Sequence, residues 1–128
     1  MSKDKVIVRC QNEDFKVEKV DNLNLEYLQS KVGGYVELVG WCDELLNLNI
    51  DMWINEEGKY IEGLIPTFIV VNKKDEIQDL IMGDVVFTSS DKKGNTIGLN
   101  DIQAQSIKKI FKRTAVLNNG AIVSVMTI

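Results

Sequence analysis

Six carboxylates gather in one stretch of the chain that has no cationic side chain. Residues 32–58 contain no lysine or arginine, and their acids are Glu37, Asp43, Glu44, Asp51, Glu56 and Glu57. A stretch of this kind favours a negative surface that binds a basic partner. The alternative is that these acids lie on solvated strand faces and turns, where charge keeps the protein soluble and blunts sheet edges.

Pairs of carboxylates, such as Asp43 with Asp51, can also bind a metal ion or work as acid and base. An acidic chain offers such pairs through its composition alone, and this one has a net charge of −4. It also has no histidine, which is the commonest general base and transition-metal ligand. Ser-His-Asp, Cys-His and histidine–metal chemistries are therefore excluded. We predict no enzymatic activity, no metal site and no cofactor.

Three aromatic residues lie in or beside the acidic stretch: Tyr35, Trp41 and Trp53. Tryptophan and tyrosine are enriched where interfaces concentrate their binding energy, although plain core packing is the alternative. Trp53 alternates with an apolar set in residues 48–54, so we expect its ring to be exposed. The predicted partner-binding residues are Tyr35, Glu37, Trp41, Asp43, Glu44, Asp51, Trp53, Glu56 and Glu57.

A second charged group has the opposite sign and lies near residue 110. It comprises Lys108, Lys109, Lys112 and Arg113 at the end of a predicted helix. With Tyr35 and the polar loop at residues 89–95, it could stack a base and hold a phosphate, which predicts a nucleotide-binding alternative. The plainer interpretation is a solvated helix end whose cations complement the helix dipole. Residues 63–128 hold eight basic and six acidic side chains, too weak a basic footprint to predict direct nucleic-acid binding.

The two cysteines, Cys10 and Cys42, cannot build a four-ligand zinc site without histidine. We expect reduced thiols in a reducing compartment, and a disulfide only if the two strands that carry them lie together. The start of the chain has no signal-peptide pattern, and no apolar run approaches the roughly 20 residues that span a membrane. These features predict a cytoplasmic protein with no membrane partner.

The elements that position these groups follow from periodicity and turn signals. A chain of 128 residues suits one domain, with a core at 5–113 and a C-terminal hairpin extension at 114–128, where Asn119-Gly120 marks a turn. The patterns predict an α+β fold, a mostly antiparallel sheet of about six to seven strands with two main helices. The strands predicted in the core are residues 5–10, 15–20, 35–41, 48–55, 67–72 and 84–88, and the C-terminal extension would add residues 115–117 and 121–127 as a hairpin. The helices are residues 23–32 and 101–113, with a further helical turn expected at 77–82.

The order of several short motifs resembles a known family. A helix ending in Leu28-Gln-x-x-Val-Gly-Gly-Tyr35-Val-Glu37 precedes Asn55-Glu-Glu-Gly-Lys59 and Gly63-Leu-x-Pro66, and Leu99-x-Asp101-x-Gln103 opens the last helix. Together they resemble the domain of unknown function numbered 3846, found in bacteria and in many phage and plasmid sequences. The family often has Leu-Pro-x-Asn-Arg near the proline, where this chain has Leu64-Ile-Pro66-Thr-Phe68.

The resemblance implies a small accessory protein of a mobile element. We expect it to bind and inhibit or modulate a macromolecule in the cytoplasm of the bacterial host cell, with components of defence systems among the candidates. This expectation is an analogy at the level of the family. The nucleotide-binding alternative stays open, as does a structural or regulatory homodimer joined through an exposed strand edge.

Overall fold

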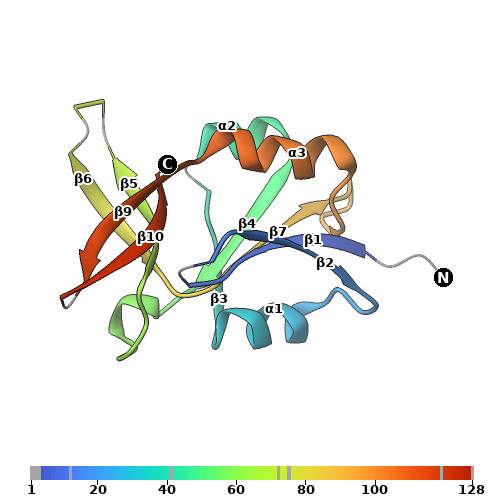
Figure 1. The fold of residues 1–128 in the computed structure, drawn as a ribbon. Helices are drawn as coiled ribbons and strands as arrows, with labels where there is room; N and C mark the ends of the chain where they lie inside the picture. Colours follow the sequence, from blue (N-terminus) through green and yellow to red (C-terminus); the bar gives the residue numbers. More distant parts are fainter. Residues whose placement is uncertain are drawn as a thin grey trace.

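The computed structural model describes residues 4–11, 13–40, 42–71, 73–74, 76–118 and 120–127. Within these residues the chain forms ten strands, three α-helices and one 3₁₀ turn, arranged in two sheets (Figure 1). The predicted α+β class is confirmed. No helix in the described part of the chain has the length and apolar content needed to cross a membrane.

The first sheet contains six strands and is antiparallel at every pairing. Its order is β2-β1-β7-β4-β3, and the short β8 pairs with β7. The strands are β1 (Asp4–Arg9), β2 (Phe15–Val20), β3 (Val36–Leu38), β4 (Ile50–Asn55), β7 (Val85–Ser90) and β8 (Thr96–Ile97). The first two predicted strands are present as β1 and β2, which pair as an antiparallel hairpin.

The second sheet contains four strands in the order β6-β5-β10-β9. They are β5 (Pro66–Val71), β6 (Ile77–Met82), β9 (Lys112–Asn118) and β10 (Ala121–Thr127). The predicted C-terminal hairpin is present as β9 and β10. Its β10 runs parallel to β5, with Met126 opposite Phe68, so the hairpin supplies half of this sheet.

Helices cover both faces of the first sheet. Helix α1 (Leu25–Val32) lies against one face, and α2 (Asp43–Asn47) and α3 (Asp101–Ile110) lie against the other (Figure 1). Asn24 caps α1, and Gly33 ends it with a φ of 84°, a conformation that glycine adopts without strain. Asn100 and Gln103 form a capping box at the start of α3, which fixes where that helix begins.

The largest core cluster joins the first sheet to the second. Four phenylalanine rings meet there, with centroids 5.1 to 6.3 Å apart: Phe15, Phe68, Phe87 and Phe111. They come from β2, β5, β7 and the end of α3, so one aromatic cluster connects both sheets and a helix. A second cluster packs beneath α1, and a third lies within the second sheet.

The structure corrects several predicted elements. Residues 77–82 form strand β6, not a helical turn, because they pair with β5. The connection at residues 43–47 is helix α2, and the strand predicted at 35–41 shortens to β3. Helix α3 ends at Ile110, so Lys112 and Arg113 belong to β9. On α3, the apolar Ile102 is 72% exposed, whereas the polar Gln103 is buried.

Candidate functional site

Asn55 sits where the family-like motifs meet, and its role is structural. The side chain is only 5% exposed. Its Nδ2 donates to the carbonyl of Val32 at 3.0 Å, and its Oδ1 accepts from the backbone N–H of Glu57 at 2.8 Å. One buried amide therefore ties the end of α1 to strand β4 and to the turn that follows it. Leaving either partner unsatisfied costs about 1–3 kcal/mol.

Two glycines of the motifs serve the same close packing. A Cβ on Gly34 would lie 3.1 Å from Nδ2 of Asn55, and one on Gly58 would lie 3.0 Å from the carbonyl oxygen of Met82. Both separations are tighter than ordinary van der Waals contact. Gly58 lets the 3₁₀ turn η1 (Gly58–Tyr60) approach β6 closely, and Gly34 leaves room for the Asn55 amide.

Three further side chains of the motifs, Glu37, Glu56 and Lys59, line a cavity of about 260 Å³ between η1 and the edges of both sheets. Its floor includes Ile54 of β4 with Ile81 and Met82 of β6. Its polar side chains are Glu37, Glu56, Lys59, Tyr60 and Asp79. We call this cavity the acidic pocket.

Charge in the acidic pocket is negative on balance. Lys59 is its single cation among the lining residues, and it pairs with Asp79. The hydrogen bond from Lys59 lowers the pKa of the Asp79 carboxyl. Within the described residues Glu37 and Glu56 have no cationic partner. Two carboxylates are therefore available to an incoming cation.

Two exposed tyrosines adjoin these carboxylates. Tyr60 is 88% exposed and lines the pocket. Tyr35 is 70% exposed, and its carbonyl accepts the backbone N–H of Glu56 at 2.9 Å. Both rings are exposed, so they are available for contact with a partner.

Of the nine residues predicted to bind a partner, four come together around the acidic pocket: Tyr35, Glu37, Glu56 and Glu57. Glu37 and Glu56 line it, Tyr35 adjoins Glu56, and Glu57 is the next exposed residue. Asp43 and Glu44 are exposed on α2, away from the pocket lining. Trp41 lies outside the described residues.

Trp53 is not exposed as its alternation predicts. Its ring is half-buried against the cluster that contains Leu28 and Val32, and its Nε1–H donates to Oγ1 of Thr88 at 2.8 Å. Alternation identifies the face of a strand, but here α1 covers the face that lacks the main core. Asp51 points to the same face by alternation, and burial raises the pKa of its carboxyl.

The predicted carboxylate pair, Asp43 with Asp51, does not form one site. Asp43 belongs to α2, on the face of the sheet where Leu45, Ile50 and Met52 pack, whereas Asp51 alternates with Ile50 and Met52 and points to the other face. No group of three histidine, cysteine, aspartate or glutamate side chains in the described part of the chain is placed to hold a metal ion. Cys10 and Cys42 are both free thiols and pack in different clusters.

Sequence reasoning missed three residues of the acidic pocket: Lys59, Tyr60 and Asp79. Lys59 lies one residue beyond the stretch without lysine or arginine, so the charge pattern of that stretch did not include it. Asp79 reaches the pocket only because residues 77–82 form a strand that crosses beside β4. No local signal marks that crossing.

A family model for DUF3846, a domain of unknown function, matches residues 3–112. The chain belongs to this family. The match ends where β9 begins, so the residues of the acidic pocket lie inside it and most of the C-terminal hairpin lies outside. Searches of curated proteins and of solved structures each found no match. The family description carries no activity.

Proposed function

We propose that this DUF3846 protein works by binding, without catalysis, and that the acidic pocket receives a basic surface of a partner protein. The observation that supports this is the convergence of Glu37, Glu56 and Tyr60 on one cavity. The two carboxylates have no cation of their own among the described residues. Packing and hydrogen bonding in the fold account for the buried motif residues Asn55, Gly34 and Gly58. They do not account for the exposed carboxylates Glu37 and Glu56.

The chemistry of the pocket defines the partner side chains that would fit. A lysine or arginine entering the pocket would make charge-assisted hydrogen bonds with Glu37 and Glu56. The faces of Tyr35 and Tyr60 would add cation–π and apolar contact. Pairs of this kind at an interface speed association and select for charge as much as they strengthen binding.

The identity of the partner follows from the family resemblance alone and stays a prediction. We propose a host protein or protein complex in the bacterial cytoplasm, met by a protein of a phage or plasmid that inhibits or modulates it. Components of bacterial defence systems are the first candidates to examine. This part of the proposal depends on analogy, whereas the basic character of the partner depends on the pocket.

Affinity capture from host lysate tests the proposal directly. The tagged protein is compared with a variant that carries Glu37→Gln, Glu56→Gln and Tyr60→Ala, and the retained proteins are quantified by mass spectrometry. We expect at least one stoichiometric protein to be lost in the variant by about tenfold or more. Retention should also fall with added salt, because exposed charges are screened.

The control carries Asp43→Asn and Glu44→Gln, two exposed acids that the fold places on α2. It removes a similar amount of charge away from the pocket and should retain the same partner within about twofold, because exposed pairs contribute little energy. Equal retention by all three proteins would show that the acidic pocket is not the binding surface. Loss in the control alone would move the interface to α2.

A further inference from the structure

A second cavity opens where α3 ends and the C-terminal hairpin begins. Its volume is about 390 Å³, within the range of small-ligand pockets. Its lining comes from β2, α3, β9 and β10 and from the residue before β2: Asp14, Phe15, Lys108, Phe111, Arg113 and Met126. Arg113 and Met126 lie beyond the family match, so this cavity depends on the hairpin. We call it the basic pocket.

The floor of the basic pocket suits a flat ring. Phe15 contributes a partly buried ring whose centroid lies 5.9 Å from that of Phe111, and Phe111 and Met126 line the cavity although they are only 5% and 4% exposed. Both rings also contact Phe68 and Phe87 in the core, which holds them in place. Aromatic rings and methionine sulfur are favourable neighbours for a planar ligand.

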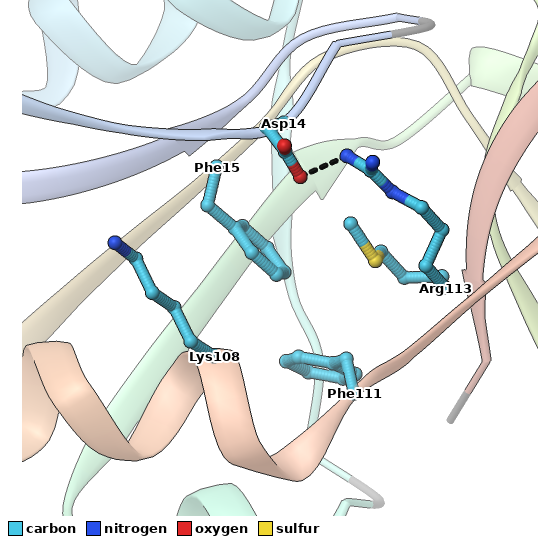
Figure 2. Close-up of a pocket in the computed structure, with 6 residues that line it drawn as sticks. Asp14, Phe15, Lys108, Phe111 and Arg113 are labelled. Carbon is cyan, nitrogen blue, oxygen red and sulfur yellow. Dashed lines mark hydrogen bonds and ion pairs between the residues drawn. The ribbon is translucent and has the colours of Figure 1, made fainter.

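The rim carries two cations and one carboxylate. Figure 2 shows Lys108 and Arg113 on either side of the Phe15 ring, with Arg113 paired to Asp14. Lys108 has no ion-pair partner in the described part of the chain. A guanidinium and an ammonium are the groups that bind phosphate in proteins, and arginine can bind it through two parallel hydrogen bonds.

A buried arginine lies behind this rim. Arg9 is 0% exposed, and it donates to the carbonyl oxygens of Cys10 at 2.9 Å and of Ser124 at 2.6 Å. Its Nε–H finds no acceptor within the described residues, and no carboxylate pairs with it there. Burial and the charge of Arg113 lower the pKa of Arg9, whereas the carboxylates of Asp14 and Asp84 act to raise it. The cations Arg9, Arg113 and Lys108 outnumber these two carboxylates, and a bound anion would offset the difference.

We propose that the basic pocket binds a nucleoside monophosphate. The base would lie on the partly exposed ring of Phe15, with the largely buried Phe111 and Met126 as neighbours, and the phosphate would contact Lys108 and Arg113. The carboxylate of Asp14 would accept hydrogen bonds from the ribose hydroxyls. The site shares no residue with the acidic pocket, so it is separate from the partner-binding function proposed above.

Isothermal titration of the purified full chain with AMP, GMP, CMP and UMP tests this site. We expect saturable binding of at least one of them, much weaker binding of the matching nucleoside, and much weaker binding of inorganic phosphate. This pattern follows because the nucleoside lacks the charge and the phosphate lacks the ring. Absence of binding by all four nucleotides at millimolar concentration would overturn the proposal.

The matched variants are Lys108→Gln and Lys109→Gln. Both positions are exposed on α3, and only Lys108 lines the cavity. We expect Lys108→Gln to weaken binding of the nucleotide by about tenfold, the scale of one charge-assisted hydrogen bond, and Lys109→Gln to change it by less than about twofold. Equal effects would show that the nucleotide associates with general surface charge, which contradicts the proposed site.

A third variant separates ring stacking from charge. Phe15→Leu keeps an apolar side chain but removes the ring face, so nucleotide affinity should fall while the weak binding of inorganic phosphate stays the same. A parallel fall in both, with an unchanged melting temperature, would show that no base lies on Phe15. The triple variant of the acidic pocket should bind the nucleotide normally, so failure of one proposal leaves the other testable.

Discussion

The acidic pocket and the basic pocket open onto the same core but carry opposite charge at their rims. Ile81 belongs to the floor of the first, and Phe111 and Met126 to the floor of the second, and all three are members of the largest core cluster. The acidic rim comes entirely from the family match, whereas Arg113 of the basic rim comes from the hairpin beyond it. One apolar core therefore carries two rims of opposite charge, because the charges lie on side chains that the core does not use.

The largest effect is expected from removing the Phe68 ring, which lies at the centre of the core that both pockets share. Phe68 is fully buried and touches the rings of Phe15, Phe87 and Phe111. Phe68→Ala should lower the free energy of unfolding by about 3–5 kcal/mol, through lost burial and the cavity left behind. Urea denaturation measures the change, and both pockets should lose binding together.

Ile122→Ala is the control for Phe68→Ala, because Ile122 is exposed on β10. It should change the free energy of unfolding by less than about 0.5 kcal/mol. A cost below about 1 kcal/mol for Phe68→Ala would contradict a shared core. The two pockets would then belong to units that unfold separately.

A variant with a smaller effect on stability should perturb the acidic pocket and leave the basic pocket unchanged. Asn55→Ala removes the hydrogen bonds to Val32 and Glu57 and should cost about 1–3 kcal/mol, because it leaves buried backbone groups unpaired. Amide chemical shifts should move around the acidic pocket and stay in place around Lys108 and Arg113. Asn22→Ala, at an exposed position before α1, is the matched control and should leave both regions unchanged.

The smallest effect concerns how α1 supports the acidic pocket as pH changes. On β2, Glu18 accepts hydrogen bonds from the Tyr27 hydroxyl at 2.7 Å and from Lys31 at 3.0 Å. Burial acts to raise the pKa of Glu18, but these two hydrogen bonds and the charge of Lys31 together lower it. The stabilisation is therefore present above the unfolded-state pKa of about 4.3 and is lost as pH falls through the lowered value.

Tyr27→Phe should reduce this acid-dependent loss of stability, since one of the hydrogen bonds that favour ionised Glu18 is gone. Chemical denaturation of both proteins across the acid range measures the difference. At the alkaline end the sign reverses, because burial and then Glu18 raise the pKa of Tyr27. That contribution is present below about pH 10 and weakens at higher pH in the parent protein only. Identical pH profiles would show that the hydrogen bond between Tyr27 and Glu18 does not contribute to the pH dependence of stability.

Much of the fold follows from local signals in the sequence. The caps of α1 and α3, the glycine after α1 and the first and last hairpins are each specified by a few adjacent residues. Strand β6 is not, because its apolar residues at 77, 80, 81 and 82 also fit helical spacing. Its pairing with β5 contains register shifts, which blur the strand pattern.

The residues of the candidate sites also differ in whether local sequence signals or contacts between distant segments bring them together. The stretch without lysine or arginine contains Glu37 and Glu56, which line the acidic pocket, but the sequence could not separate them from Asp43, which lies on α2. Gln103 shows why a buried polar side chain is hard to predict from the sequence. Its Nε2 donates to the carbonyls of Leu48 and Asn49 and to Oγ of Ser89. A polar side chain can be buried when hydrogen-bond partners surround it in the fold. Here those partners lie far from Gln103 in the sequence, so no local pattern indicates them.

The parallel pairing of β10 with β5 also affects how the protein is made. Strands β5 and β6 leave the ribosome well before β10 exists, and at about 5–20 residues per second the delay lasts several seconds. During that interval the edge of β5 that β10 will cover stays open to other strands. The second sheet is therefore completed only after the last strand has been synthesised, and chaperones have a natural point of action on the nascent chain.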